Sequence, residues 1–429
     1  MDRIELNRAK VFKGEFSPPP DKSISHRSVI FSSLAKGTST VRNFLRAEDT
    51  FSTMNAFRSL GIEIIDEGAT LTIHGKGVRG LSEPGDVIDC GNSGTTIRLL
   101  SGVLAGNPFF SVLTGDRSLR TRPMGRVIRP LSLMGAHIIA RDDSRYPPLA
   151  IKGGNLSPIT YVMPVASAQV KSALLLAGLY TEGDMEIVEP VRSRDHSEKM
   201  LPAFGADITV DGLRITVRGG RELRALDTLV PGDFSSAAFF IVAALLIPGA
   251  EITAKNVGLN PTRTGLLEVL KNMGASIGIG NVRDVSGEPV ADLFCKGRAD
   301  LKGVSISGEI VPSLIDEFPI LCVAAALAEG TTVIRGAEEL RVKESDRIKT
   351  MTAELRKMGV AIEEYPDGLS IRGTGKLHGA EVESHGDHRI AMSMAVAALA
   401  AGGRTVINGA SAVDISFPGF FDLIGRLSS

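Results

Sequence analysis

The sequence is poor in the residues on which several protein classes depend. Of its 429 residues only three are cysteine, none is tryptophan, and aromatic residues make up 5%. Cys90, Cys295 and Cys322 lie far apart and form no C-x-x-C pair, which excludes a disulfide scaffold and disfavours a zinc-thiolate site. The low aromatic content leaves little for stacking on nucleic-acid bases.

Long apolar runs and an excess of one charge are also missing. The formal net charge is −1, so we expect no nucleic-acid footprint. The longest apolar runs, 237–248 and 390–402, are shorter than the roughly 18 residues that a membrane span needs. The charged start MDRIELNRAK lacks the apolar segment of a secretory signal. We therefore expect a soluble cytoplasmic protein without membrane contact, and the length predicts two domains.

Two interleaved patterns recur along the chain. The first is a helix that ends in a glycine ahead of a strand, and the second is an Ala/Leu-rich helix followed by a strand, which occurs six times. Glycine suits a left-handed helix end because it has no Cβ. Two periods of similar length predict six units of about 71 residues each. The glycines of the first pattern are Gly61, Gly135, Gly205, Gly274 and Gly359.

These units predict an α/β (α+β) fold with two similar domains, each of three βαβαββ units. The Ala/Leu-rich helices should be buried and the glycine-ended helices amphipathic. The sixth unit stops early, so the N-terminal strands RIELNRA and KVFKGEF should complete it. We expect residues 1–17 and 231–429 to form the domain that holds both termini, and 18–230 to form an inserted domain. Hinges near 17–20 and 229–233 would let the cleft between them close on a ligand.

Hydroxyl-bearing and cationic residues gather where each Ala/Leu-rich helix begins. The six segments are DKSISHR, GNSGTTIR, ASAQVKS, GDFSSA, IDEFP and GDHRIA. Helix N-termini bind anions, and arginine binds phosphate or carboxylate with two hydrogen bonds. A solvated helix end is the alternative for any one cation, but the grouping at matched positions favours an anion site. The cations are Lys22, Arg27, Arg98, Arg122, Arg194, Lys343, Arg347 and Arg389.

Three further side chains are candidates for proton transfer. Asp316, which we expect to begin a helix, and Glu344 are carboxylates within the cationic set, and the alternative for both is helix capping. His388 either carries a proton or packs in the core. HGDH at 385–388 is a weak metal pattern, and CGNSGT matches neither common nucleotide loop. We therefore expect neither a metal nor a cofactor.

With these motifs the chain closely resembles the 5-enolpyruvylshikimate-3-phosphate synthase family. The likeness covers nearly the whole sequence, and the motifs follow the family's order: PPDKSISHR, GNSGTTIRLL, RPM, PVASAQVKSA, RDHSEKM, VPGDFSSAAFF, LNPTRTG, IDEFP, EELRVKESDR and GDHRIAM. The resemblance implies transfer of the enolpyruvyl group of phosphoenolpyruvate to the 5-hydroxyl of shikimate 3-phosphate, with release of phosphate, on the route to chorismate and aromatic amino acids. It also implies an active site in the interdomain cleft. We expect a monomer.

The resemblance also implies a role for individual residues. Our own hypothesis is that Asp316 is the base at the 5-hydroxyl and that Glu344, with Lys22 nearby, protonates the enol methylene. His388 is a fourth catalytic candidate. The shikimate 3-phosphate contacts would be Lys22, Ser23, Arg27, Ser167, Ala168, Gln169, Arg194, Asp316 and Lys343. The phosphoenolpyruvate contacts would be Lys22, Asn92, Gly94, Arg122, Gln169, Arg347 and Arg389.

Position 415 bears on the branch of the family, and position 94 bears on the response to glyphosate. Ile415 stands where one branch has a lysine, which places the chain in the other branch. Gly94 is not the alanine of herbicide-tolerant relatives, so we expect glyphosate to compete with phosphoenolpyruvate.

Three other functions are considered. A sister enzyme that transfers enolpyruvyl to a UDP-sugar carries a reactive cysteine in a loop that reads GDRSLRTRP here. A non-catalytic, anion-binding repeat scaffold is a second alternative. An RNA-end-processing enzyme would need a basic face, which the balanced charge disfavours.

Overall fold

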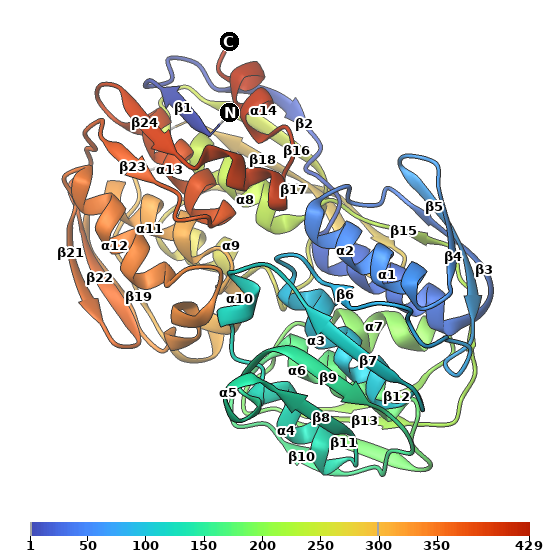
Figure 1. Cartoon of the computed structure of the whole chain (residues 1–429). Coiled ribbons are helices and arrows are strands. Elements are labelled where there is room, and N and C mark those ends of the chain that lie inside the picture. Colours follow the sequence, from blue (N-terminus) through green and yellow to red (C-terminus); the bar gives the residue numbers. More distant parts are fainter. Residues whose placement is uncertain (1, 298–299) are drawn as a thin grey trace. The chain divides into compact units, whose positions relative to one another are not determined.

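The structure is a computed structural model that describes residues 2–297 and 300–429. It divides into two compact units (Figure 1). The terminal unit, which holds both chain ends, comprises Met1–Pro19, Pro231–Asp284 and Glu288–Ser429. The inserted unit comprises Pro20–Val230 and Val285–Gly287. Val285–Gly287, which lie at the tip of a long hairpin, fall outside the range 18–230 that was expected for the inserted domain.

The inserted unit contains three sheets with one common strand order. In each sheet a leading strand runs parallel to the strand that follows a buried helix, and the next two strands continue antiparallel. The first sheet is β14 (Leu223–Arg224), β3 (Ala35–Arg42), β5 (Thr70–Lys76) and β4 (Glu63–Asp66), with β15 (Thr228–Leu229) also beside β3. The second is β6 (Ile88–Asp89), β7 (Phe110–Thr114), β9 (Tyr146–Lys152) and β8 (His137–Ala140). The third is β10 (Thr160–Val162), β11 (Asp184–Val188), β13 (Arg214–Arg218) and β12 (Asp207–Asp211).

The terminal unit repeats this order in its first two sheets, and its third sheet has only the first three of the four positions. Its first sheet is β2 (Lys13–Phe16), β16 (Glu251–Gly258), β18 (Glu288–Lys296) and β17 (Ile277–Val285). Its second is β19 (Ser305–Ile306), β20 (Gly330–Ile334), β22 (Gly368–Gly373) and β21 (Ala361–Tyr365). Its third is β23 (Glu381–Glu383), β24 (Thr405–Asn408) and β1 (Arg3–Leu6). The expected α/β class is confirmed by six sheets that alternate with helices.

The two N-terminal strands do not both complete the last sheet. β1 pairs antiparallel with β24, as expected, but β2 pairs in parallel with β16 in another sheet. The expectation for KVFKGEF was therefore wrong. The strands that precede the fourth buried helix, β14 and β15, pair instead with β3 of the inserted unit. This leaves the leading position beside β16 open for β2.

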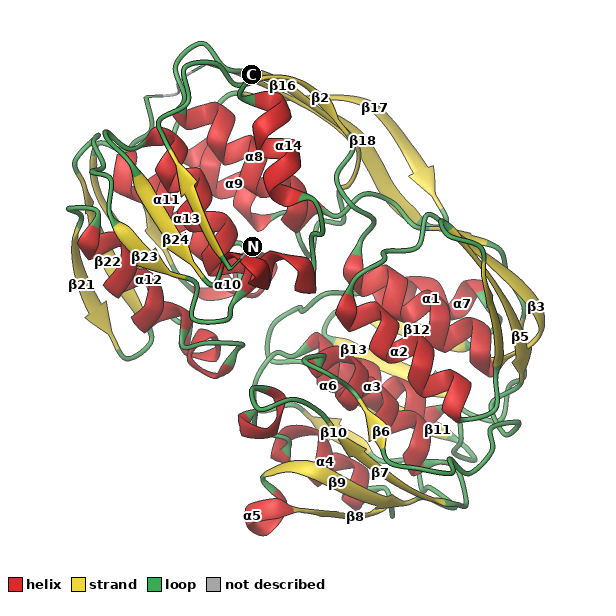
Figure 2. Cartoon of the chain, turned by 45° about the horizontal axis from the view of Figure 1, so that its top comes forward, coloured by secondary structure: helices red, strands yellow, loops and turns green. Residues whose placement is uncertain are grey.

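The six Ala/Leu-rich helices are buried along nearly their whole length, as predicted. Figure 2 shows helices inside each unit and sheets on its outside. The buried helices are α1 (Lys22–Leu34), α3 (Gly94–Ala105), α6 (Ala168–Gly178), α8 (Phe234–Leu246), α11 (Phe318–Leu327) and α13 (His388–Ala400). The partly exposed second helices are α2 (Glu48–Ser59), α4 (Gly125–Leu133), α7 (His196–Ala203), α9 (Gly265–Asn272), α12 (Arg347–Lys357) and α14 (Phe420–Leu427).

Short helical segments complete the connections. They are η1 (Leu119–Thr121), α5 (Arg141–Ser144), η2 (Gly308–Ile310), α10 (Val311–Leu314), η3 (Glu338–Val342) and η4 (Ala410–Ile415). No helix in the described part of the chain combines the length and apolar character that a membrane crossing requires.

The glycines of the first sequence pattern end the second helices as predicted. All five have a positive φ, from +86° at Gly61 to +106° at Gly135. At this backbone conformation a side chain would be strained. The repeat seen in the sequence is therefore a repeat of helix ends, and it fixes where each following strand begins.

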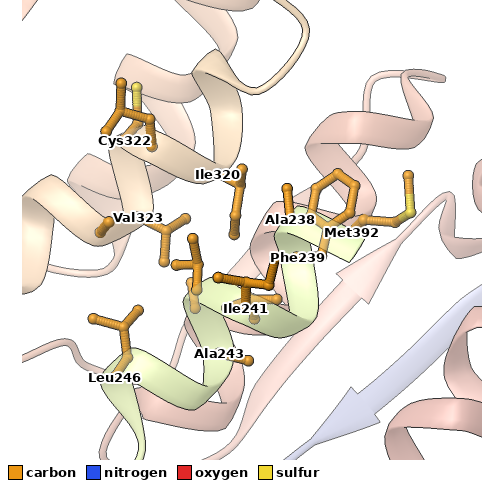
Figure 3. Close-up of a cluster of buried hydrophobic side chains, with 14 of the residues drawn as sticks. Ala238, Phe239, Ile241, Ala243, Leu246, Ile320, Cys322, Val323 and Met392 are labelled. Carbon is orange, nitrogen blue, oxygen red and sulfur yellow. The ribbon is translucent and has the colours of Figure 1, made fainter. Parts of the chain in front are cut away.

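Apolar side chains pack the buried helices against one another. In the terminal unit Phe239 and Ile241 of α8 pack among Ile320 and Val323 of α11, with Met392 of α13 beside them (Figure 3). Each large apolar side chain buried in this way contributes about 1.5–3 kcal/mol to folding. Because the helix bodies cannot shift easily in such a core, the first turns of these helices are held in place.

We predict that Gly102→Ala destabilises the inserted unit. A Cβ at Gly102 in α3 would lie 2.1 Å from the carbonyl oxygen of Ala173 in α6, so the helices must separate. The expected loss is about 1–3 kcal/mol, seen as a lower thermal midpoint. The control is Gly125→Ala at the start of α4, where no atom lies within 4 Å of the added methyl. A Gly102→Ala protein as stable as this control would show that the helices are not in close contact.

Candidate functional site

The helix starts of the inserted unit are capped as the sequence predicts. The side chains of Asp21, Ser93 and Ser167 accept hydrogen bonds from backbone N–H groups in the first turns of α1, α3 and α6, at 2.8, 3.1 and 3.4 Å. Each cap satisfies one N–H group of its helix start and fixes the direction in which the chain enters.

Two predicted cations of α1 are held by side chains from other helices. Lys22 Nζ lies 3.0 Å from Asp49 Oδ2 in α2. Arg27 is buried; its Nε donates to Ser197 Oγ in α7 at 2.8 Å, and its Nη2 donates to Ser172 Oγ in α6 at 2.7 Å. A third bond runs from Arg27 Nη1 to the carbonyl of Ser23. The predicted residues Lys22, Ser23 and Arg27 therefore form one anchored group at the start of α1.

The start of α3 is surrounded by guanidinium groups. A Cβ at Gly94 would lie 2.8 Å from Arg98 Nη1 and 3.0 Å from Arg122 Nη1. Arg122 Nη2 donates to Asn92 Oδ1 at 2.7 Å, and Asn92 Nδ2 donates to Asp116 Oδ2 at 2.6 Å. A side chain at position 94 would therefore have to displace the ends of Arg98 and Arg122. Asn92 holds Arg122 in place.

Gln169 ties the start of α6 to α3. Its Oε1 accepts from Arg98 Nη1 at 2.6 Å, and its Nε2 donates to Thr95 Oγ1 at 2.9 Å. It follows Ser167, the cap, and Ala168, the first residue of α6. Arg194 lies half-buried in the connection between β11 and α7. The predicted residues Arg98 and Gln169 thus link α3 to α6, together with Thr95, which was not predicted.

His26 was not among the predicted residues, although it lies inside the KSISHR motif. It is fully buried, and its Nδ1 shares a hydrogen bond of 2.7 Å with Thr53 Oγ1. Thr53 is paired with Thr96 at 2.6 Å, and Thr96 donates to Ser93 Oγ. Burial, and then the charges of Lys22 and Arg27, hold the pKa of His26 well below its ordinary value of 6.5. A neutral histidine therefore connects α1 to the caps of α3.

In the terminal unit the central predicted residue is Arg347, which is 1% exposed. Its Nε donates to Asp387 Oδ2 at 2.9 Å and its Nη2 to Glu344 Oε2 at 2.7 Å. Burial alone would lower the pKa of Arg347, but Asp387 and Glu344 outweigh it and raise the pKa. For Asp387 burial alone would raise the pKa, but the charge of Arg347 outweighs burial and holds the pKa below its ordinary value. The pair is a buried, fully ionised contact.

Asp316 lies between two arginines. Its Oδ1 is 3.5 Å from Arg347 Nη1, and its Oδ2 is 3.4 Å from Arg389 Nη2. Arg389 Nη1 also donates to the backbone carbonyl of Asp316 at 3.1 Å. Asp316 does not begin a helix, because α11 starts at Phe318 with Glu317 as its N-cap residue. Asp316 is held by the arginines, and Glu317 accepts from Ser235 Oγ instead of capping the helix.

Lys343 and His388 differ in their surroundings. Lys343 is half-buried; burial lowers its pKa, and the charge of Asp316 partly offsets this. His388 is buried in the first turn of α13, while His385 Nε2 lies 2.9 Å from Glu354 Oε1. The two histidines of HGDH therefore have separate surroundings. In residues 2–297 and 300–429 no three His, Cys, Asp or Glu side chains are grouped for a metal.

The predicted residues thus form two groups, one in each unit. The inserted unit holds Lys22, Ser23, Arg27, Asn92, Gly94, Arg98, Arg122, Ser167, Ala168, Gln169 and Arg194; the terminal unit holds Asp316, Lys343, Glu344, Arg347, His388 and Arg389. Sequence reasoning missed the carboxylates Asp49 and Asp387, which hold Lys22 and Arg347. A signal for Asp387 was present, since it occupies the N-cap position in GDHRIA. For Asp49, in the first turn of a second helix, the repeat gave no signal.

Comparison with known proteins gives a match over nearly the whole chain. The family model described as EPSP synthase (3-phosphoshikimate 1-carboxyvinyltransferase) matches residues 6–424. The 3-phosphoshikimate 1-carboxyvinyltransferase of Thermodesulfovibrio yellowstonii is 56% identical over 429 residues, and that of Geobacter sulfurreducens is 56% identical over 428 residues; each alignment covers 100% of both chains. A solved structure of EPSP synthase from Acinetobacter baumannii superimposes with a TM-score of 0.87 at 48% identity, covering 99% of this chain and 98% of that one.

We predict that the buried His26 makes the protein less stable in acid. In the unfolded chain His26 titrates near 6.5, whereas its folded pKa is lowered, so the unfolded state binds more protons below pH 6.5. His26 therefore does not destabilise the fold above pH 6.5. Below that pH it lowers the free energy of unfolding by up to about 1.4 kcal/mol for each pH unit. His26→Asn keeps a hydrogen-bonding group near Thr53 and does not titrate. Its thermal midpoint should fall less than that of the wild type between pH 7 and 5.5; equal falls would refute the assignment.

Proposed function

Because the chain belongs to the EPSP synthase family, we propose that it transfers the enolpyruvyl group of phosphoenolpyruvate to the 5-hydroxyl of shikimate 3-phosphate and releases phosphate. The observation that carries the proposal is the set of anchored cations at the starts of buried helices. Each substrate has a phosphate and a carboxylate, so four anionic groups must be bound. Helix starts and arginine side chains are the groups that bind such anions.

We assign the substrate contacts from the family pattern and from the groups described above. Shikimate 3-phosphate would bind Lys22, Ser23, Arg27, Ser167, Ala168, Gln169, Arg194, Asp316 and Lys343. Phosphoenolpyruvate would bind Lys22, Asn92, Gly94, Arg122, Gln169, Arg347 and Arg389. The assignment requires both units to contribute side chains to the same ligands. It is supported within each unit by the contacts that hold Lys22, Arg27, Arg122, Arg347 and Arg389, because cations held in place need less reorganisation on binding.

The proposed chemistry is an addition followed by an elimination. Asp316 removes the proton of the 5-hydroxyl, whose oxygen attacks C2 of phosphoenolpyruvate, and Glu344 with Lys22 delivers a proton to the methylene carbon. The resulting tetrahedral intermediate loses phosphate as the proton transfers reverse. Arg347 and Arg389 lie beside Asp316 and orient its carboxylate, the group that would accept the proton. His388 is a fourth candidate, and its burial in α13 favours a packing role.

Phosphate release tests the proposal directly. The full-length protein should release phosphate only when both shikimate 3-phosphate and phosphoenolpyruvate are present. A UDP-sugar acceptor, offered in place of shikimate 3-phosphate, tests the sister activity; the absence of cysteine from residues 115–123 disfavours it. Release with the UDP-sugar and not with shikimate 3-phosphate would overturn the proposal in favour of the sister enzyme. No release with either acceptor would overturn it in favour of a non-catalytic scaffold.

We predict that Asp316→Asn lowers turnover by about a hundredfold or more, because the amide cannot accept the hydroxyl proton. Binding of shikimate 3-phosphate should remain within about tenfold, since the substitution keeps the shape of the side chain. Arg347 keeps its contacts with Asp387 and Glu344, so the fold should persist. Steady-state rates and calorimetric binding measure the two effects, with Asp414→Asn on an exposed segment of η4 as the control. Near-normal turnover would remove Asp316 from the mechanism.

We also predict that glyphosate inhibits the protein in competition with phosphoenolpyruvate. Gly94→Ala should weaken this inhibition, because the methyl group would displace Arg98 and Arg122 from their present positions, and it should raise the KM for phosphoenolpyruvate as well. Initial rates at varied phosphoenolpyruvate concentration distinguish competitive inhibition from other kinds. Gly125→Ala is the control. A wild-type enzyme that millimolar glyphosate leaves unaffected is the contrary result.

A further inference from the structure

A buried ion cluster lies one turn into α6, behind the residues assigned to the substrates. Lys171 is 0% exposed. Its Nζ lies 2.8 Å from Glu189 Oε2 and 2.6 Å from Glu198 Oε1, and it donates to the backbone carbonyl of Ser193 at 3.3 Å. The two carboxylates come from different places: Glu189 directly follows β11, and Glu198 lies in α7.

Stability alone gives a weak account of this cluster. Removing an ion from water costs several kcal/mol, and apolar residues of similar volume often replace a buried ion pair without loss of stability. The cluster also contains two carboxylates for one ammonium, and burial raises the pKa of Glu198. What such a cluster does provide is a fixed geometry, because a buried charge tolerates few arrangements of its partners.

The geometry that is fixed is that of the connection between β11 and α7. Glu189 Oε1 accepts from the backbone N–H of Ser193 at 3.2 Å and from the Ser193 hydroxyl. Because Lys171 binds the carbonyl of the same residue, Ser193 is held at its N–H, its hydroxyl and its carbonyl. Arg194, one of the assigned shikimate 3-phosphate contacts, is the next residue along the chain.

Lys171 also belongs to the helix start that carries other assigned contacts. Its backbone N–H donates to the carbonyl of Ser167 at 3.0 Å in the first turn of α6, and Gln169 lies between them. The backbone of Lys171 therefore belongs to the start of α6, and its side chain binds the loop. Glu198 differs, since in the described part of the chain its carboxylate contacts Lys171 and not the loop.

We infer that Lys171 and Glu189 are positioning residues that set Arg194 at a fixed place relative to Ser167 and Gln169 and thereby determine the affinity for shikimate 3-phosphate. The inference rests on the proposed function. Neither residue touches the ligand in this assignment. Their effect passes through the loop of residues 189–195.

Two isosteric substitutions separate positioning from burial of charge. Glu189→Gln leaves one oxygen where two are needed, so the side chain cannot accept from both Lys171 and Ser193. Glu198→Gln keeps the one oxygen that faces Lys171. Both changes remove one buried negative charge beside the same lysine. Glu189→Gln should raise the KM for shikimate 3-phosphate about tenfold, the effect of one lost charge-assisted hydrogen bond, with the KM for phosphoenolpyruvate within about twofold. Glu198→Gln should change neither KM by more than about twofold.

A third variant tests the route through the loop. In an Arg194→Ala background Glu189→Gln should add less than about twofold to the KM, because the residue that it positions is gone. Equal KM values for Glu189→Gln and Glu198→Gln would overturn the inference. A tenfold rise in KM when Glu189→Gln is added to the Arg194→Ala protein would overturn it as well. If Glu189→Gln does not fold, Ser193→Ala, which removes the hydroxyl only, should raise the same KM severalfold, and an unchanged KM there would likewise overturn it.

Calorimetric binding of shikimate 3-phosphate to the full-length protein keeps this test separate from the proposed reaction. A wild type that binds shikimate 3-phosphate but releases no phosphate contradicts the proposed activity, and the positioning inference is then judged from the dissociation constants of the same variants. A wild type that releases phosphate, with a Glu189→Gln protein that binds shikimate 3-phosphate as tightly as Glu198→Gln, contradicts the inference alone.

Discussion

Cations fixed at or near the starts of helices are the constraint on which the rest of this structure depends. A buried cation must be paired inside the protein, and here the partners are specific. Asp49 holds Lys22, Asp387 holds Arg347, and Asn92 holds Arg122. Each partner satisfies its cation before any ligand is present and also fixes its direction. The proposed substrates supply further negative charge to side chains that are already oriented, which is the arrangement that stabilises charge in a transition state.

The repeated fold explains how such side chains come to be gathered. Each buried helix is enclosed by apolar neighbours, so its first turn has little freedom, and each unit contains three of these helices with equivalent surroundings. Glycine ends the second helices at a positive φ, which fixes the strands that follow. The same design places an aspartate or a serine at the N-cap position of five of the six buried helices. Binding groups can therefore vary from unit to unit while the scaffold stays constant.

Much of this was predictable from the sequence because the signals were periodic. The six buried helices, the five helix-ending glycines and the caps Asp21, Ser93 and Ser167 follow local rules of helix chemistry. The pairing of β2 was not predictable in that way. β14 and β15 precede the fourth buried helix in the sequence but pair with β3, and β2 takes the place beside β16. No local sequence signal marks this exchange. The buried partners Asp49 and Glu189 were missed for a related reason. They are separated in sequence from the cations that they hold, by 27 residues for Asp49 and 18 for Glu189, and no motif joins them.

The most direct test of the central claim is a crystal structure of the Asp316→Asn protein with shikimate 3-phosphate and phosphoenolpyruvate bound. The account predicts that the anionic groups of both ligands are contacted by cations of both units, with Lys22, Arg122, Lys343 and Arg389 among them. Ligands that meet the cations of one unit only, or that bind at other surfaces, would contradict it.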